Sequence, residues 1–331
     1  MQLPALIIDK LVAKLPIIQG GMATRISTSR LAAAVANEGG IGIIAATGMS
    51  PGELIQEIRM ARKLTSGIIG INVLFAVRDF ALLVKTALDE GIDLVISGAG
   101  VARDMYKWGR DAQTPIVPIV SSAKLASMVE KMGASAVVVE GKEAGGHLGT
   151  HRSVREIVPE VRVAVDIPII AAGGIIDGRD IVDAFSWGAN GVQMATRFAA
   201  SVESNASDAF KKLYLKAKHE DVVVIKSPVG LPGRGLRNLF TERLFHNEDL
   251  TPLKCSGCLK KCSRNFCILD ALDNAQKGRI DEGIVFAGEA VERIKEILPV
   301  KKIIENIKAE LAALPEHTGT AGNEVMKEAV E

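Results

Sequence analysis

Aromatic side chains are scarce in this chain of 331 residues, at only 4% of the total. An excess of charge is also missing, because 40 Lys and Arg residues nearly balance 39 Asp and Glu residues and leave a formal net charge of +1. Proteins that bind nucleic acids normally carry a basic excess, and single-strand binders need aromatic surfaces on which bases stack. The composition therefore argues against a nucleic-acid partner.

Long apolar runs are absent as well. None reaches the roughly 18–20 residues that a membrane-spanning helix needs. The N-terminal stretch MQLPALIIDKLVAK carries charges inside its short apolar patches and lacks the layout of a signal peptide. We expect a cytoplasmic protein with no membrane partner.

Cysteine is rare and confined to one place. All four cysteines lie between Cys255 and Cys267, too close together to cross-link a secreted fold of this length. Apolar residues at 48% and charged residues at 24% are typical of a globular protein with a sizeable core.

Short apolar runs rich in Val and Ile alternate with amphipathic stretches along the first part of the chain. Near-continuous apolar strands are typical of a parallel sheet that is covered on both faces. The runs predict strands at 16–20, 41–46, 69–74, 93–99, 116–121, 136–140, 168–172 and 191–196. The stretches between them predict helices at 27–38, 51–64, 80–90, 102–108, 123–132, 153–161 and 180–187.

This alternation predicts an α/β fold, a TIM (β/α)₈ barrel, with a doubly wound open sheet as the alternative. We assign residues 1–200 to the barrel and 201–280 to an inserted helix and loop region with the cysteines. After the last barrel strand we expect a helix at 198–218, a strand at 222–226 and a loop at 227–247. Residues 281–314 are expected to form helices that pack back on the barrel, ending in a helix at 304–314, and 315–331 a frayed tail.

Two turns follow the last two predicted strands. The first, AAGGIIDG, contains Ala172, Gly173 and Gly174, and the second is VQMATR at 192–197. In barrels the loops after strands 7 and 8 commonly bind phosphate, because glycine lets backbone N–H groups approach an anion and a following helix N-terminus adds positive charge. The alternative is an ordinary tight turn.

A histidine follows the sixth predicted strand in EGKEAGGH, residues 140–147. Active sites of barrels are built at this end of the strands, and a histidine can act as an acid or a base near neutral pH. The preceding Gly145 and Gly146 would let a flat ligand lie against the backbone. His147 is therefore the candidate catalytic residue, with a hydrogen-bonded structural histidine as the alternative.

Weaker candidates lie at two other strand ends. Gly20, Gly21 and Met22 follow the first strand, and Asn72 lies in the third. A buried amide needs partners for its donor and acceptor atoms, which the edge of a heteroaromatic ring or the backbone can supply.

The cysteines are spaced Cys255-x2-Cys258-x3-Cys262-x4-Cys267. Four thiolates this close can bind one metal centre, and the compact run favours a [4Fe–4S] cluster over a zinc ion, with four free thiols as the remaining alternative. Basic side chains surround them and would offset the thiolate charge, attract an acidic carrier or simply lie in solvent: Lys254, Lys260, Lys261 and Arg264.

Taken together, these motifs resemble the nitronate monooxygenase (2-nitropropane dioxygenase) family, which includes the flavin-dependent enoyl-ACP reductase II enzymes. The resemblance covers about residues 10–205. It rests on PIIQGGMA at 16–23, GINVL at 70–74, VVVEGKEAGGHLGT at 137–150, AAGGIIDGRD at 171–180 and GVQMATRFAASVESN at 191–205.

The resemblance implies that the barrel binds FMN, with Gly20, Gly21, Met22 and Asn72 along the isoalloxazine ring. Lys124 and Glu140 match positions that line the flavin pocket, and His147 matches the active-site histidine. Gly173, Gly174, Gln193, Met194 and Thr196 would hold the phosphate end; Gly145, Gly146, Ala172 and Ala195 complete the cofactor-binding set. Ala195 stands where the family commonly has glycine, and the cysteines are not part of the family pattern.

These observations lead to one main hypothesis and three alternatives. The main one is an FMN-dependent, NAD(P)H-dependent reductase of enoyl thioesters with an iron–sulfur site. The alternatives are a nitronate monooxygenase that uses O₂, a flavin and iron–sulfur enzyme served by a ferredoxin-like carrier, and a redox-sensing module. The partners expected are a small molecule or acyl thioester, an acyl carrier protein and a second copy of the chain in a homodimer.

Overall fold

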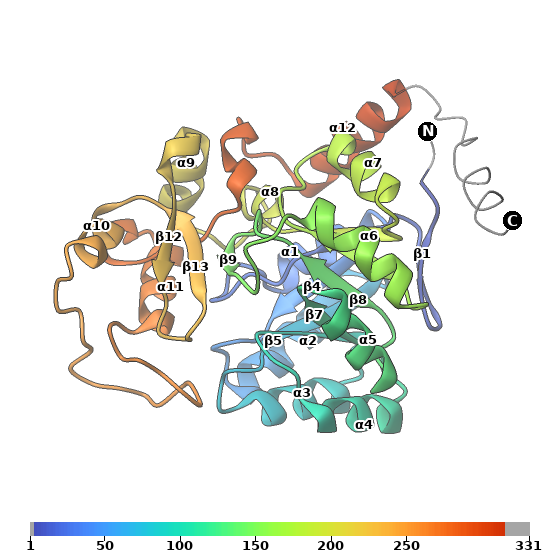
Figure 1. The fold of residues 1–331 in the computed structure, drawn as a ribbon, viewed down its shortest axis with the longest axis horizontal. Helices are drawn as coiled ribbons and strands as arrows, with labels where there is room; N and C mark the ends of the chain where they lie inside the picture. Colours follow the sequence, from blue (N-terminus) through green and yellow to red (C-terminus); the bar gives the residue numbers. More distant parts are fainter. Residues whose placement is uncertain (1–2, 315–331) are drawn as a thin grey trace, which may run out of the picture.

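Figure 1 shows the computed structural model of the chain, which describes residues 3–314. The expected tail at 315–331 lies outside the described residues. Eight parallel strands close into a barrel, which confirms the TIM-barrel prediction and excludes the open sheet. Their order around the barrel is β3 (Ile17–Gln19), β4 (Ile41–Ala45), β5 (Ile68–Leu74), β6 (Leu94–Gly98), β7 (Ile116–Val120), β8 (Val137–Glu140), β10 (Ile169–Ala172) and β11 (Gly191–Met194).

The barrel strands are apolar on both faces because both faces are buried. In β4, Ile43 packs in the interior of the barrel, while the next residue, Ile44, packs in the layer between strands and helices. Successive side chains of a strand point to opposite faces, so a strand between two apolar layers needs an unbroken apolar run. This explains why the strands are visible in the sequence.

Seven helices surround the barrel: α1 (Ser29–Asn37), α2 (Pro51–Leu64), α3 (Phe80–Asp89), α4 (Arg103–Ala112), α5 (Ala123–Lys131), α6 (Val154–Ala164) and α7 (Gly178–Ser186). The start of α2 is as the sequence predicts, because Pro51 occupies its first turn and the Ser50 hydroxyl accepts a hydrogen bond from the Glu53 amide at 3.2 Å. The predicted boundaries differ from the observed ones by a few residues, most at α4, which continues to Ala112.

A hairpin of β1 (Leu6–Ile8) and β2 (Leu11–Ala13) precedes the barrel and was not predicted. Leu6 and Ile8 are buried in the same cluster as the interior residues of the barrel. Leu6 also lies against Gly191, the first residue of β11. The hairpin therefore covers the end of the barrel opposite the ends at which the strands finish.

The region after the barrel differs from the prediction in two places. The helix expected at 198–218 is two helices, α8 (Thr196–Ala199) and α9 (Asp208–Lys216). The loop expected at 227–247 contains β13 (Pro232–Leu236) and α10 (Leu239–Phe245). The sequence PGRGL of β13 lacks the β-branched residues of a typical strand. Glycine is needed there because a Cβ on Gly235 would lie 2.6 Å from the carbonyl oxygen of Val285.

β13 pairs with β12 (Val222–Lys226), which the sequence predicted, and with β9 (Gly146–His147). This small sheet lies beside the barrel, with α9, α10 and α11 (Ile268–Gln276) further out (Figure 1). The final helix, α12 (Val300–Ala313), starts before the predicted 304 and packs against α7 and α1. The C-terminal region thus supplies both a layer over the barrel and a partner strand for the histidine.

Candidate active site

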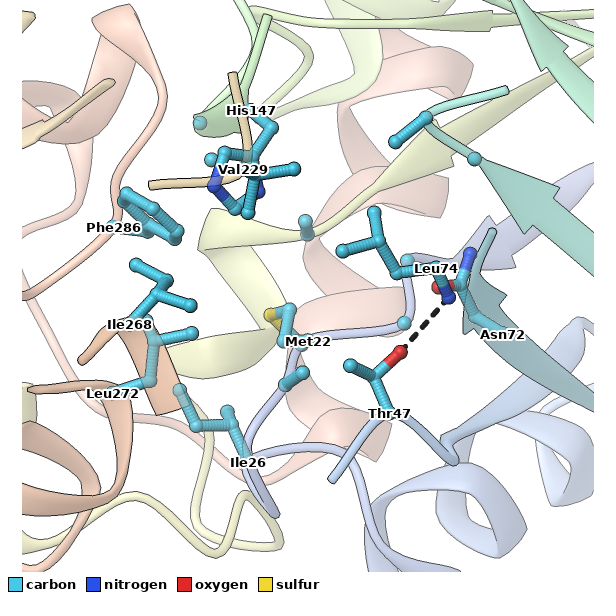
Figure 2. A pocket seen from close by; sticks show the side chains of 18 of the residues that line it. Met22, Ile26, Thr47, Asn72, Leu74, His147, Val229, Ile268, Leu272 and Phe286 are labelled. Atoms are coloured by element: carbon cyan, nitrogen blue, oxygen red, sulfur yellow. Dashed lines mark hydrogen bonds between the residues drawn. The ribbon is translucent and has the colours of Figure 1, made fainter. Parts of the chain in front are cut away.

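Two adjoining cavities lie where the barrel strands end. One is larger and opens beside His147, and the smaller one lies beside the turn after β10. Five residues line both of them, so they form one continuous site: Glu140, Gly145, Gln193, Ala195 and Thr196. Figure 2 shows the larger cavity with residues of several elements pointing into it.

The smaller cavity is built on the glycine turn after β10. Gly173 and Gly174 have φ values of +111° and +74°, which favour glycine, and both line this cavity with Ala172. Among residues 3–314, the amides of Gly173, Gly174 and Ile175 donate no hydrogen bond to a protein group. Free backbone donors around a small cavity suit a phosphate group.

The N-terminus of α7, in contrast, is already occupied by carboxylates of the protein. The Asp177 side chain accepts from the amides of Arg179 and Asp180, and the Glu310 side chain accepts from the amide of Gly178 at 2.7 Å. The amides at the N-terminus of α7 are therefore not free to bind a phosphate group. The donors available are those of the turn itself.

Gly20, Gly21, Met22 and Asn72 meet on one side of the larger cavity. Gly21 lies so close to Asn72 that a Cβ on the glycine would be 2.3 Å from the Asn72 Cβ. A flat surface of backbone next to a side-chain amide results, as a planar heteroaromatic ring requires. Figure 2 places Met22 and Asn72 across the cavity from His147.

Gln193 carries an unsatisfied polar atom at the junction of the cavities. Its Oε1 is buried and has no hydrogen-bond partner within the described part of the chain. A buried acceptor without a partner is costly, and a donor on a bound ligand would satisfy it. Together with the flat surface and the free amides, this fits a ligand that is planar at one end and anionic at the other, as FMN is.

His147 enters the larger cavity from β9, which the pairing of Gly233 with His147 attaches to β13. Its Nε2 lies 2.8 Å from the Ser227 hydroxyl, and its ring meets the Phe286 ring edge-on at 5.2 Å between centroids. Burial lowers the pKa of His147 to about 4, so the imidazole is neutral at physiological pH. A neutral imidazole can accept a proton or donate one hydrogen bond, but it holds no positive charge.

Glu140 ends β8 and lines both cavities. Burial raises the pKa of its carboxyl group to about 8, which leaves it mostly protonated at pH 7. A protonated carboxyl group is a hydrogen-bond donor as well as an acceptor. Perturbed groups of this kind, gathered in one cavity, are characteristic of an active site.

Two of the expected cofactor residues lie elsewhere. Lys124 is exposed in the first turn of α5 and lines neither cavity. Met194 is only 1% exposed and packs in the core behind the cavity wall. All the other expected cofactor residues, including Gly145, Gly146, Ala195 and Thr196, line one or both cavities.

The model of the nitronate monooxygenase family matches residues 5–83 and 75–310. The chain belongs to the nitronate monooxygenase family. Its relatives carry the names of oxidoreductases, and this family member is accordingly an FMN-type oxidoreductase.

Three relatives illustrate what this family member is similar to. It is 37% identical to FabK from Thermotoga maritima, whose structure superposes with a TM-score of 0.82 and covers 90% of this chain and 93% of that one. A nitroalkane oxidase from Streptomyces ansochromogenes is 28% identical with a TM-score of 0.78, over 90% and 96% of the two chains. This chain is also 33% identical over 238 residues to a protein of Rhodococcus jostii, the (3aS,4S,5R,7aS)-5-hydroxy-7a-methyl-1-oxo-octahydro-1H-indene-4-carboxyl-CoA dehydrogenase. The match covers 72% of this chain and 67% of that protein.

The outer wall of the larger cavity comes from residues that the sequence analysis missed. It is apolar and is supplied by the loop after β5, the turn after β12, the cysteine-containing segment at 249–267, α11 and the segment that follows α11. Its residues include Val77, Val229, Leu259, Ile268, Leu269, Leu272 and Phe286. Ser227 was also missed. It is the first residue of the expected loop at 227–247, in which no candidate site residue was named. No pattern in this family member's sequence marks these residues, because only the tertiary fold brings them to the histidine.

The cysteine segment, residues 249–267, does not form the expected metal site. Within residues 3–314, no group of three or more His, Cys, Asp and Glu side chains is placed to hold a metal ion. Cys255 and Cys262 are exposed, Cys258 and Cys267 are half-buried, and all four are free thiols. Burial raises the pKa of Cys258, with the charges of Cys262 and Cys255 adding to the rise, and burial raises that of Cys267 to about 11. The arrangement does not fit a preformed iron–sulfur or zinc centre.

No helix within residues 3–314 of this family member is both long and apolar enough to cross a membrane.

Proposed function

We propose that this chain is an FMN-dependent reductase that uses NAD(P)H to saturate the carbon–carbon double bond of an acyl thioester. One observation carries the proposal: beyond the ring-binding side, the wall around His147 is apolar and contains no Lys or Arg. Such a wall suits an acyl chain. It offers no counter-ion to the carboxylate of a substrate such as propionate 3-nitronate.

The flat surface of Gly20, Gly21 and Met22 would hold the ring of FMN, and the turn at Gly173 and Gly174 its phosphate. When bound, FMN supplies hydride chemistry, taking a hydride from a nicotinamide and passing it to an activated double bond. The chain itself must hold the thioester carbonyl, exclude water and provide a proton for the second carbon.

His147 and Glu140 divide these tasks by their protonation states. With a pKa of about 4, His147 is neutral and can orient the thioester carbonyl by a single hydrogen bond, while Ser227 fixes its ring. With a pKa of about 8, the Glu140 carboxyl group carries a proton at neutral pH and is the better proton reservoir. The apolar wall around them excludes water.

The likeness to FabK and to a carboxyl-CoA dehydrogenase supports a thioester substrate. An acidic acyl carrier protein is the partner we propose. Four basic side chains of the cysteine segment, Lys254, Lys260, Lys261 and Arg264, are exposed beside Leu259 in the cavity wall, and no acidic residue occurs between residues 250 and 269.

The test compares two substrates on the FMN-loaded protein. Crotonyl-CoA with NADH or NADPH, without oxygen, should yield butyryl-CoA in step with nicotinamide oxidation. Propionate 3-nitronate in air should give no oxygen uptake above background. The opposite pattern would establish the alternative, a nitronate monooxygenase, which the neutral His147 also favours because a neutral imidazole is a competent base.

A further inference from the structure

The cysteine segment is part of the cavity wall, although the proposed reaction does not use its thiols. It connects α10 with α11 and is seen as the long loop below these helices in Figure 1. Most of it is exposed, but Leu259 is only 4% exposed and lines the larger cavity. Cys258 directly precedes this residue, so the position of one thiol is tied to the shape of the wall.

The first attachment of the segment is to the loop after β5. Leu259 forms an antiparallel bridge with Val77, which also lines the cavity. The Arg78 amide donates to the carbonyl oxygen of Cys258 at 2.9 Å, and the Lys260 amide donates to that of Ala76 at 2.8 Å. These alternating hydrogen bonds require an extended backbone from Cys258 to Lys260.

The second attachment is to the turn that carries Ser227. The Ser263 amide donates to the carbonyl oxygen of Pro228 at 3.2 Å, and the Asn265 side chain donates to that of Lys226 at 3.3 Å. Ser227 and Pro228 are neighbours in this turn, and Val229 after them lines the cavity. The stretch from Cys258 to Cys262 therefore spans two supports of the active site.

We propose that Cys258 and Cys262 are a reversible redox pair whose disulfide shifts Leu259 in the wall of the larger cavity. The Cα atoms of a disulfide lie about 4.4–6.8 Å apart, whereas a four-residue extended run reaches about 13 Å. The chain already bends at Lys260 and Lys261, so the ring can close there by drawing Cys258 and Cys262 together across the bend. Because the carbonyl oxygen of Cys258 accepts the hydrogen bond of the Arg78 amide beside the Val77–Leu259 bridge, moving Cys258 strains this attachment.

Exposure sets the order of the chemistry. A hydroperoxide such as hydrogen peroxide reaches the exposed Cys262 first and converts its thiol to a sulfenic acid with release of water or alcohol. The half-buried Cys258 thiol then attacks this sulfur, and a second water leaves as the disulfide forms. Two thiols are oxidised, one hydroperoxide is reduced, and a dithiol reverses the step by exchange.

Trypsin sites between the two cysteines allow the disulfide to be mapped. Trypsin cleaves after Lys260 and Lys261, between the two cysteines, so the tryptic peptides 255–260 and 262–264 stay joined only through a disulfide. FMN-loaded full-length protein is treated with hydrogen peroxide and digested without reductant. We expect loss of two of the four titratable thiols, joining of these two peptides, and their separation by dithiothreitol.

Hydrogen exchange, measured by mass spectrometry on the same samples, shows whether the backbone of the cavity wall becomes less protected. It needs no assay of turnover. The amides of Arg78 and Lys260 are protected by the bridge and should exchange faster after oxidation. Cys262→Ser should abolish both the link and the change in exchange, and Cys255→Ser, the matched control, should keep both.

Three results would overturn the proposal. The first is a link to peptide 265–277 or one within 255–260 in place of the expected link. The second is a Cys258–Cys262 disulfide that leaves exchange at the bridge unchanged. The third is iron or zinc bound at the four cysteines in protein purified without oxygen, since thiolates that hold a metal are not a free redox pair. None of these results depends on whether the protein reduces thioesters.

Discussion

The Nε2 atom of His147 lies 2.8 Å from the hydroxyl oxygen of Ser227, a residue 80 positions further along the chain. The sheet of β9, β13 and β12 creates this contact, since β9 carries the histidine and Ser227 directly follows β12. The catalytic candidate is therefore positioned by the region after the barrel, and its ring orientation depends on a serine outside the barrel.

Replacing Ser227 by alanine should slow the reaction without loss of cofactor. The imidazole loses one hydrogen bond of about 1 kcal/mol, and the ring is then free to rotate away from the substrate. We expect kcat/KM with crotonyl-CoA to fall about tenfold, mainly in kcat, with unchanged FMN content. Ser186→Ala is the matched control, because this exposed hydroxyl on α7 contacts only the Asp183 carbonyl. A Ser227 variant as active as the control would show that the contact does not position the histidine.

Protonation of His147 should contribute to unfolding by acid. Its pKa falls from 6.5 to about 4 on folding, so the fold favours the neutral ring. The stabilisation is complete above pH 6.5 and is lost as the pH falls from 6.5 to 4, with a loss of about 2 kcal/mol after allowance for partial exposure. Urea unfolding of wild type and His147→Asn at several pH values should show that their difference in stability changes across this window. A constant difference would mean that the histidine does not titrate there.

Glu140 should make FMN binding weaker in alkaline solution. Its pKa is raised to about 8, so the carboxyl group gains a negative charge as the pH passes this value, next to a ligand that is itself anionic. The dissociation constant of FMN, measured by flavin fluorescence, should rise between pH 7 and 9 in the wild type. Glu140→Gln mimics the protonated acid and should remove this dependence. A variant that retains the full pH dependence would assign it to another group.

The barrel was predictable from sequence because its determinants are local. Each strand is an unbroken apolar run between two buried layers, and the turns after β10 and β11 carry their glycine and small residues at the site itself. The family motifs at Gly20 and Gly173 directly follow barrel strands and Asn72 lies near the end of β5, where the topology of a barrel brings them together. His147 follows β8 after a short loop and reaches the same end of the barrel in β9.

The outer half of the site was not predictable because its determinants are not local. Ser227, Leu259 and Phe286 lie in segments without a periodic pattern and reach the cavity only through long-range pairing. β13 was mistaken for a loop because its glycines serve close packing, Gly235 against Val285 and Gly233 against Phe286, which no local pattern reveals. The spacing of the cysteines indicates that four thiols are near one another in sequence. Whether they converge on one point depends on the path of the backbone, which bridges Cys258 to the loop after β5 instead.

Ala195 fills space next to Gly20. A Cβ on Gly20 would lie 3.0 Å from the Cβ of Ala195, closer than two methyl groups normally pack. Gly20→Ala should therefore lower the free energy of unfolding by about 1–2 kcal/mol and reduce FMN retention.

Removing the opposing methyl group should restore the loss. In the double variant Gly20→Ala, Ala195→Gly, the new methyl group occupies the space that the old one leaves, so the two changes should be non-additive by about 1 kcal/mol in favour of the double variant. Gly52→Ala is the control, since a Cβ there meets no atom within 4 Å and should leave both stability and FMN content intact or slightly raised. Chemical unfolding of the four members of the cycle, with flavin content measured on each, decides the matter. Additive losses would mean that Gly20 is required for its approach to the ligand and not for its contact with Ala195.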